Sequence, residues 1–181
     1  MILETERLAL RELVPADLDE LHAVLGDAET MRYYPAPFDR GKTSGWIEWN
    51  IGSYREHGFG LWAVILKETG AFVGDCGITM QDIDGETLPE LGYHIAKEHW
   101  NKGYASEAAG ACMEFAFVAL GLETLYTYTK HDNLPSRRVA EKIGMAFVKE
   151  FEKTVYGVPV REALYRLRRA DSPLRSNGPG D

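Results

Sequence analysis

Residues 92–108 combine glycine, small residues and a basic side chain in a pattern that is typical of an anion site beside a helix. They read GYHIAKEHWNKGYASEA: a predicted strand ends, a short loop holds Gly103, and a long helix begins. Backbone N–H groups at a helix N-terminus, together with the helix dipole, bind phosphate oxygens. Gly103 lets the backbone approach a bulky anion, Lys102 adds a positive charge, and Ala105 and Ser106 are small. The alternative is an ordinary strand-to-helix turn.

Residues 130–145, KHDNLPSRRVAEKIGM, predict a second helix with polar groups at its start. Its expected buried stripe consists of Val139, Ala140 and Ile143. Ser136 lies one turn earlier, at the edge of that stripe. Asn133 sits just ahead of the helix, where it or Asp132 would cap the N-terminus in a purely structural interpretation. Arg138 and Lys142 form a basic outer edge.

The elements that position these segments follow from hydrophobic periodicity and turn residues. Strands are predicted over residues 6–13, 61–66, 72–80, 90–95, 125–129, 147–155 and 162–167, with an Asp-Gly hairpin turn near residues 82–85. Helices are predicted over residues 41–57 and 106–120, and two more begin at Pro15 and Pro135 and end at Gly26 and Gly144. A meander followed by a strand–helix–strand–helix–strand run predicts an α/β fold, a mixed sheet with helices packed on it.

Length and charge limit the classes of protein to consider. The 181 residues predict one domain over residues 1–170, and residues 171–181, DSPLRSNGPGD, predict a disordered tail. The net charge of −8 argues against a dedicated nucleic-acid binder. The charged N-terminus is not a signal peptide, and no apolar run approaches the ~20 residues of a membrane span. We therefore expect neither a nucleic-acid nor a membrane partner.

Cys76 and Cys112 each lie in an apolar stretch that predicts a regular element. No cysteine–histidine spacing suits zinc, so we expect no metal. Free buried thiols, and with them a cytoplasmic location, are the expectation, and a single disulfide between the two is the alternative.

The two motif stretches resemble the GCN5-related N-acetyltransferase (GNAT) superfamily, in particular its ribosomal-protein-alanine N-acetyltransferase branch. That branch shows GY…W-G-K-G-Y-A-T/S-E-A and N-x-x-S…K-x-G-F, where this chain has GYHIAKEHWNKGYASEA and NLPSRRVAEKIGM. Residues 4–11, ETERLALR, are similar to its first strand, and the likeness runs over residues 3–168. Asn101 replaces a frequent glycine and Met145 an aromatic residue. Trp100 stands where the superfamily commonly has Gln or Arg, so Lys102 supplies the charge.

The resemblance implies a mostly antiparallel central sheet with helices on both faces and acetyl-CoA as co-substrate. The strands at residues 90–95 and 125–129 would splay apart around the pantetheine arm. The implied cofactor residues are the backbone of His94 and Ile95, a pyrophosphate cradle of Lys102, Gly103, Tyr104, Ala105 and Ser106, and the helix residues Asn133, Ser136 and Lys142.

The resemblance also implies direct acetyl transfer in a ternary complex. An amine attacks the thioester, a base takes its proton and an acid meets the leaving thiolate. We assign the base to Glu90, for which a solvated strand end is the alternative, and the acid to Ser136. Tyr128 or Tyr126 is the alternative acid, although each is equally suited to packing in a strand.

The acceptor is less specified by the sequence. A protein N-terminus, a small amine (an amino acid, polyamine or aminoglycoside) and a non-catalytic acyl-CoA-binding module all remain open, and the chain would be a monomer or homodimer. The aromatic and apolar residues expected near the acceptor are Met31, Tyr33, Tyr34, Phe38, Trp46 and Trp49, which more often form core than pocket. We interpret the histidines as incidental; they are His22, His57, His94, His99 and His131.

Overall fold

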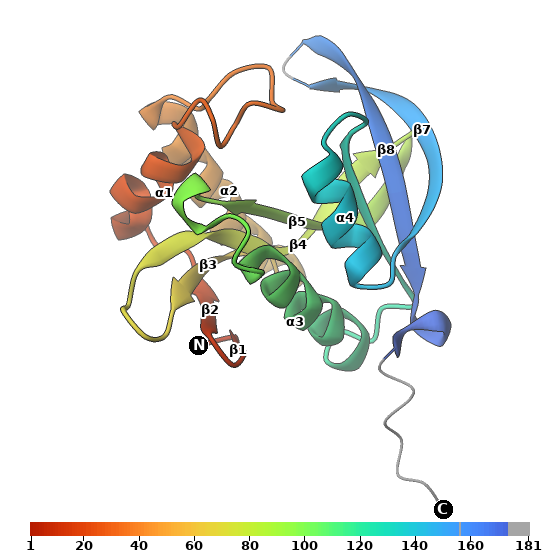
Figure 1. Cartoon of the computed structure of the whole chain (residues 1–181), viewed down its shortest axis with the longest axis horizontal. Helices are drawn as coiled ribbons and strands as arrows, with labels where there is room; N and C mark the ends of the chain where they lie inside the picture. The colour runs from red at the N-terminus through yellow and green to blue at the C-terminus, as the bar shows by residue number, and fades with distance from the viewer. Residues whose placement is uncertain (156, 174–181) are drawn as a thin grey trace, which may run out of the picture.

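The structure is a computed structural model that describes residues 1–155 and 157–173. Its centre is an eight-stranded sheet of order β1-β2-β3-β4-β5-β6-β8-β7 (Figure 1). The strands are β1 (Leu3–Glu4), β2 (Leu8–Glu12), β3 (Leu61–Leu66), β4 (Phe72–Ile83), β5 (Glu86–Ile95), β6 (Thr124–Lys130), β7 (Ala146–Val155) and β8 (Val158–Arg168). Neighbours pair antiparallel except β5 and β6, which are parallel. The predicted mixed, mostly antiparallel sheet is confirmed.

Residues 1–155 and 157–173 form four α-helices. They are α1 (Leu18–Leu25), α2 (Arg40–His57), α3 (Tyr104–Val118) and α4 (Leu134–Lys142), with 3-10 turns η1 (Pro15–Asp17), η2 (Lys97–His99) and η3 (Arg169–Asp171). The Asp39 side chain caps α2, and Gly58, at φ 78°, ends it. Helix α3 begins two residues before its predicted start, directly after Gly103.

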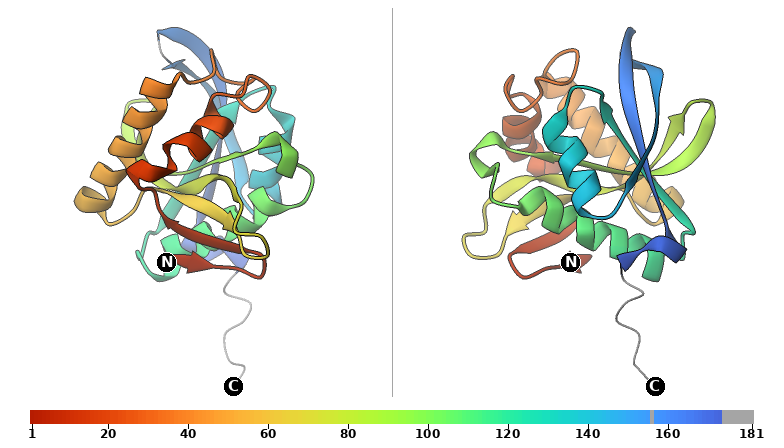
Figure 2. Two further views of the ribbon diagram at one scale, coloured as in Figure 1. Left: turned by 90° about the vertical axis from the view of Figure 1, so that its left-hand side faces the viewer. Right: turned by 45° about the vertical axis from the view of Figure 1, so that its right-hand side comes forward.

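The helices cover both faces of the sheet. Helices α1 and α2 pack on one face and share a core with residues of β3 and the loops; it comprises Leu13, Leu21, Val24, Leu25, Met31, Phe38, Ile47 and Ala63. Helices α3 and α4 pack on the other face (Figures 1 and 2). The larger core there includes Leu91, Ala108, Ala116, Leu125, Ala140, Ala163 and Tyr165. Strand β5 therefore presents alternate side chains to two different environments.

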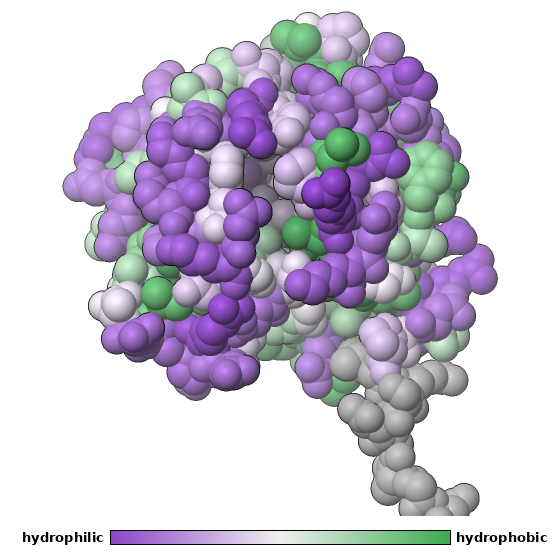
Figure 3. All heavy atoms as spheres, viewed as in Figure 1, coloured by the Kyte–Doolittle hydropathy of each residue, from purple (hydrophilic) through white to green (hydrophobic). Residues whose placement is uncertain are grey.

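Strands β5 and β6 separate soon after they meet. One parallel pairing, Glu90 with Tyr126, joins them, and the Thr127 hydroxyl donates to the Leu91 carbonyl at 2.7 Å. Beyond this point the sheet opens towards the C-terminal ends of both strands. Figure 3 shows the surface hollowed above α3, between α4 and the segment that follows β5. The predicted splay between these strands is thus present.

Two thiols meet in the larger core. Cys76 of β4 and Cys112 of α3 are both fully buried and free, with their Sγ atoms 3.6 Å apart. The prediction of free buried thiols is confirmed, and the disulfide alternative is not realised.

The chain after β8 differs from the prediction at its start. Asp171 ends the turn η3, and Ser172 is 6% exposed, so the predicted disordered tail does not begin at residue 171. The rest of that tail, residues 174–181, lies outside the described residues. Within residues 1–155 and 157–173, no helix is both long and apolar enough to cross a bilayer.

Candidate active site

The loop before α3 has the geometry of an anion site. Asn101 and Gly103 have positive φ angles of 60° and 84°, so the chain turns sharply into the helix. Within the described part of the chain, no side chain caps this helix end. The first backbone N–H groups of a helix have no partner within it, so those of residues 104–106 point out of the positive end of the helix dipole. The structure therefore gathers the predicted residues 102–106 around one helix N-terminus.

Two side chains that the sequence interpretation gave no role hold this loop in place. Arg7 Nη1 donates to the Lys102 carbonyl at 2.9 Å, and Arg7 Nε donates to Glu107 Oε2 at 2.7 Å. Burial opposes ionisation of Glu107, but hydrogen bonds from Thr5 and Arg7 lower its pKa. The indole N–H of Trp100 donates to the Ile95 carbonyl at 2.7 Å. The loop is thus fastened to β2 and to the end of β5.

The backbone of His94 points away from the opening, contrary to the prediction. Its N–H donates to Asp75 Oδ1 at 3.1 Å, and the next N–H on that side, of Ala96, donates to the Val73 carbonyl at 2.9 Å. Both acceptors belong to β4. Because backbone groups alternate between the two edges of a strand, the N–H of Ile95 faces the opening. The expectation of a backbone contact is therefore corrected for His94 and stays a prediction for Ile95.

The N-terminus of α4 borders the other side of the opening. Asn133 Oδ1 accepts from the Ser136 N–H at 3.2 Å, and Asn133 Nδ2 donates to Thr129 Oγ1 at 3.1 Å. Asn133 is therefore a helix cap, as its structural interpretation held, and its contact with a cofactor stays a prediction. Lys142 is exposed in the last turn of α4, about 9 Å along the axis from Ser136. Its predicted contact likewise stays a prediction.

A phenol that the sequence interpretation did not consider lies beside Ser136. The Tyr93 hydroxyl is 2.8 Å from Ser136 Oγ and donates to the Ser136 carbonyl at 3.1 Å. Burial raises the pKa of Tyr93, so the phenol keeps its proton. The predicted alternatives Tyr126 and Tyr128 pack instead against a small cluster on the other face, formed by Ile83, Phe151 and Leu164. They are therefore poor candidates for an acid that acts beside Ser136.

Glu90 lies on the face of β5 opposite to α3. It is 8% exposed, so the alternative of a solvated strand end is wrong. Thr79 Oγ1 donates to Glu90 Oε2 at 3.4 Å, and Gly92 leaves room for the carboxylate, since a Cβ there would lie 3.1 Å from Oε2. Burial raises the pKa of Glu90 to about 7, against the opposing charges of Lys153 and His94. A carboxylate with this pKa can exchange a proton near neutral pH.

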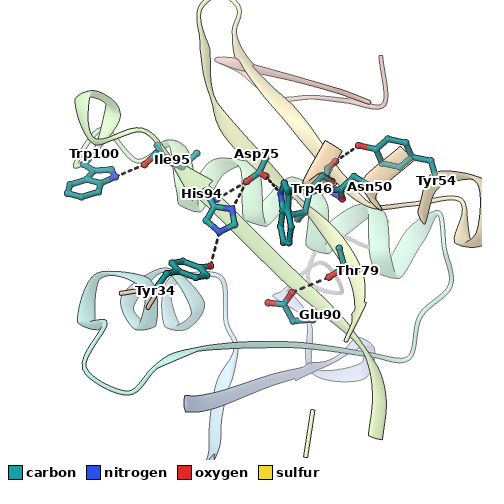
Figure 4. A network of polar contacts seen from close by, with 11 residues as sticks. Tyr34, Trp46, Asn50, Tyr54, Asp75, Thr79, Glu90, His94, Ile95 and Trp100 are labelled. Atoms are coloured by element: carbon teal, nitrogen blue, oxygen red, sulfur yellow. Dashed lines mark hydrogen bonds and ion pairs between the residues drawn. The ribbon is translucent and has the colours of Figure 1, made fainter. Parts of the chain in front are cut away.

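A chain of polar contacts extends along the same face (Figure 4). His94 Nδ1–H donates to Asp75 Oδ1 at 2.7 Å, and the Trp46 indole N–H donates to Asp75 Oδ2 at 3.0 Å. His94 Nε2 and the Tyr34 hydroxyl share a hydrogen bond of 2.7 Å. Burial alone would lower the pKa of His94, but the adjoining Asp75 carboxylate outweighs it and raises the pKa. The His94 side chain thus joins Asp75 to Tyr34 in a buried polar network, while a role for it in the reaction is not established by these contacts.

The residues expected near the acceptor divide into core and surface. Met31 and Phe38 are 1% and 3% exposed and belong to the core under α1 and α2. Tyr34 and Trp49 are 39% and 40% exposed, and the Trp49 ring lies 5.0 Å from that of Trp46, between centroids. Only the aromatic surface formed by Tyr34, Trp46 and Trp49 borders the polar chain of Figure 4.

Known proteins are similar to this chain in sequence and in fold. The model of the acetyltransferase (GNAT) domain matches residues 7–146. The uncharacterized protein YkkB of Bacillus subtilis is 38% identical over 152 residues, 83% of this chain and 88% of its own. The uncharacterized N-acetyltransferase p20 of Bacillus licheniformis is 30% identical over 156 residues, 83% of this chain and 87% of its own.

A solved structure agrees with the sequence matches. The crystal structure of a GNAT-family acetyltransferase from Bacillus anthracis superposes with a TM-score of 0.79 at 29% identity, covering 94% of this chain and 99% of that one. The family match over most of the chain, the shared fold and the helix-end loop beside the opened sheet agree with one another. The chain therefore belongs to the GNAT family of acetyltransferases.

Proposed function

We propose that this protein transfers the acetyl group of acetyl-CoA to a primary amine, by direct attack of the amine in a ternary complex. The observation that carries the proposal is the opening between β5 and β6. The helix-end loop lies towards the α3 side of this opening, and a buried carboxylate, Glu90, lies on the other face of β5. A cofactor and an acceptor that enter from opposite faces would meet at this opening.

The residues around the loop suit the cofactor. The backbone N–H groups of residues 104–106 and the side chain of Lys102 would hold the pyrophosphate, and the N–H of Ile95 would hold an amide of the pantetheine arm. When bound, acetyl-CoA supplies the activated acetyl thioester. Gly103 keeps the loop open, because a side chain at its φ of 84° would be strained and would crowd the loop.

The protein itself supplies the proton transfers. The Glu90 carboxylate accepts the proton that the attacking amine loses, for which its raised pKa of about 7 is well suited. On the other face, the Ser136 hydroxyl, held 2.8 Å from the Tyr93 hydroxyl, donates a hydrogen bond to the leaving sulfur. A buried, proton-exchanging carboxylate supports an enzyme over a non-catalytic acyl-CoA-binding module.

The acceptor is a protein N-terminus or a small amine. Calorimetry with CoA tests the cofactor site first, and acetyl transfer to a panel of peptides and small amines then tests the reaction. We expect CoA to bind and at least one class of amine to be acetylated. Absence of CoA binding at millimolar concentration would refute the proposal. Binding without acetylation of any amine would instead support the binding-module alternative.

A further inference from the structure

A second buried carboxylate, that of Glu162 in β8, is not used by the mechanism above. Glu162 is 6% exposed. Its Oε2 atom is buried, and no group in residues 1–155 or 157–173 hydrogen-bonds to it. Nor does Glu162 appear in an ion pair among these residues. Burial of an ionised carboxylate without partners is unfavourable, so a ligand that donated a hydrogen bond to this oxygen would stabilise its ionised form.

The sheet places Glu162 on the same face as Glu90. Glu162 pairs with Lys130, and two residues further along β8, Leu164 pairs with Tyr128. Paired residues in a sheet share a face, and Leu164 packs in the small cluster with Leu88, which is on the Glu90 side of β5. Alternate residues of β8, such as Ala163, belong to the core under α3 and α4.

The two carboxylates therefore lie on either side of the opening between β5 and β6. Strands β5, β6 and β8 are successive neighbours in the sheet. Glu90 is level with Tyr126, and Glu162 is level with Lys130, four residues further along β6. At about 4.8 Å per strand and about 3.3 Å per residue, the two backbones are at least about 10 Å apart across the sheet and roughly 13 Å apart along it, and the charge of Glu162 still contributes to the raised pKa of Glu90. One nitrogen would not contact both carboxylates at once, whereas two nitrogens joined by a chain long enough to span them would.

The charges on this face indicate the sign of the ligand group that Glu162 would bind. The charge of Lys153, which is half-buried, acts on both glutamates. Its ammonium donates to the Asp82 carbonyl and lies 4.6 Å from the Tyr128 ring centroid. Two other nearby bases are each matched by a carboxylate, His94 by Asp75 and Lys130 by Asp132. With Glu90 and Glu162 ionised and the reacting amine neutral, as attack requires, these two carboxylates and Lys153 sum to one negative charge. One further positive charge on the acceptor would balance it.

The pKa shifts agree with this geometry. Burial raises the pKa of Glu162 to about 7, with Lys153 and Lys130 opposing the shift and Asp132 adding to it. Burial also lowers the pKa of Lys153, despite the neighbouring carboxylates. A cation brought in by a ligand would relieve the unfavourable charge on Glu162.

We propose that Glu162 binds a second positive group on the acceptor, so that the substrate is a primary amine carrying another cationic hydrogen-bond donor further along its chain. This inference rests on the proposed acetyl transfer. A free diamine and a peptide with a basic residue near its N-terminus share this chemistry. Glu162 would act in selecting the acceptor, and Glu90 in the reaction.

The test compares unbranched α,ω-diamines with n-alkylamines of the same chain lengths, and peptides with lysine at the second position with peptides that have norleucine there. We expect the dicationic member to have at least about tenfold higher kcat/KM once its chain spans the two carboxylates, since a hydrogen bond between charged groups is among the stronger ones. The pair that shows the preference identifies the source of the amine.

The variant Glu162→Gln should reduce this preference to near unity, with a larger loss of kcat/KM for the dication than for the monoamine, and Glu162→Asp should keep part of the preference. The matched control is Glu152→Gln, which removes an exposed carboxylate from the adjacent strand, opposite Arg161 and hence on the other face. Equal use of mono- and dications by the wild type, or an equal loss for both in Glu162→Gln, would overturn the inference.

Binding provides a readout that does not depend on turnover. Calorimetric titration of the protein with each amine pair, with and without CoA, should show the same preference and its loss in Glu162→Gln. Equal affinities would overturn the assignment of Glu162. A protein that binds dications preferentially and acetylates none of them would contradict the proposed reaction but not the binding site.

Discussion

The loop before α3 and the face of β5 that carries Glu90 are built in different ways. The loop uses backbone: consecutive residues 101–106 turn through two positive φ angles and present N–H groups at a helix end. The face that carries Glu90 uses side chains from distant parts of the chain. Asp75 comes from β4, Glu90 and His94 from β5, and Trp46 from α2.

This difference predicts how each region responds to substitution. A site made of backbone N–H groups depends on torsion angles and on empty space, so most side-chain changes leave it intact. A site made of buried side chains depends on the identity and protonation of each group. The predictions below test this contrast, beginning with the largest expected effect.

Replacing Gly103 by valine should abolish measurable CoA binding. The residue adopts φ 84°, where a β-branched side chain is strained, and its Cβ would lie 3.3 Å from Arg7 Nη2. Calorimetry with CoA measures the loss. The matched control is Gly110→Ala in the middle of α3, where a Cβ meets no atom within 4 Å. This control should bind CoA normally, and normal binding by Gly103→Val would show that the loop is not the phosphate site.

Replacing Glu90 by glutamine should lower kcat/KM by about a hundredfold or more near neutral pH, because the base is lost while the shape is kept. With its pKa raised to about 7, the wild-type rate should rise with pH through that region and then level off. The variant should not show this rise near pH 7, and its kcat/KM should recover partly at high pH, where more of the amine is unprotonated. A pH–rate profile shared by both proteins would leave the base unassigned.

The same substitution should stabilise the fold at alkaline pH. A carboxyl whose pKa rises from 4.5 to about 7 on folding binds its proton more tightly in the folded state, so its ionisation removes stability as pH rises from 4.5 to 7. Glutamine avoids this loss, which is at most about 3 kcal/mol. Thermal unfolding should give Glu90→Gln a higher Tm than the wild type at pH 8 and a similar one at pH 5. A lower Tm at pH 8 would contradict the assigned shift.

Replacing Ser136 by alanine should lower kcat by about tenfold, the effect of one lost hydrogen bond, while CoA affinity changes less. Tyr93→Phe should cause a similar loss, because it removes the hydroxyl 2.8 Å from Ser136 Oγ. Tyr128→Phe is the control on the opposite face of the sheet. A loss confined to CoA affinity would make Ser136 a binding residue only. A larger loss of kcat in Tyr128→Phe than in Ser136→Ala would show that the acid lies on the other face of the sheet.

Replacing Trp100 by phenylalanine should weaken CoA binding only several-fold. It removes the hydrogen bond of 2.7 Å to the Ile95 carbonyl, which contributes about 0.5–1.5 kcal/mol, but leaves the backbone of residues 101–106 free to form the same turn. Calorimetry with CoA checks this small effect. Complete loss of binding would show that the loop depends on its side-chain support and not mainly on its own torsion angles.

The contrast also explains which parts were predictable from sequence. The Asp-Gly hairpin turn adopts φ 55° and 85° at Asp84 and Gly85, because local steric preferences decide such torsions. The turn at Gly103 and the periodicity of apolar residues are likewise determined by residues close together in the sequence. The predicted fold therefore agrees with the structure, and the predicted loop is present at the start of α3, while its contact with phosphate stays a prediction.

The contacts between side chains that are distant in sequence could not be predicted from local sequence patterns. That Tyr93 meets Ser136, and that Asp75 contacts both His94 and Trp46, depends on cross-strand register and on how α2 and α4 pack. The error over the His94 backbone has the same origin. Strand alternation predicts that neighbouring residues face opposite edges, but only the register with β4 decides which of them faces the opening.

The thiols of Cys76 and Cys112 can report how often helix α3 separates from the sheet. They lie 3.6 Å apart, fully buried between β4 and α3, and burial raises the pKa of the Cys76 thiol so that little thiolate forms. A water-soluble thiol reagent reaches them only when α3 lifts from the sheet. The rate of labelling therefore measures how often α3 opens. Because α3 begins directly after Gly103, a ligand bound at the proposed phosphate loop should slow the labelling.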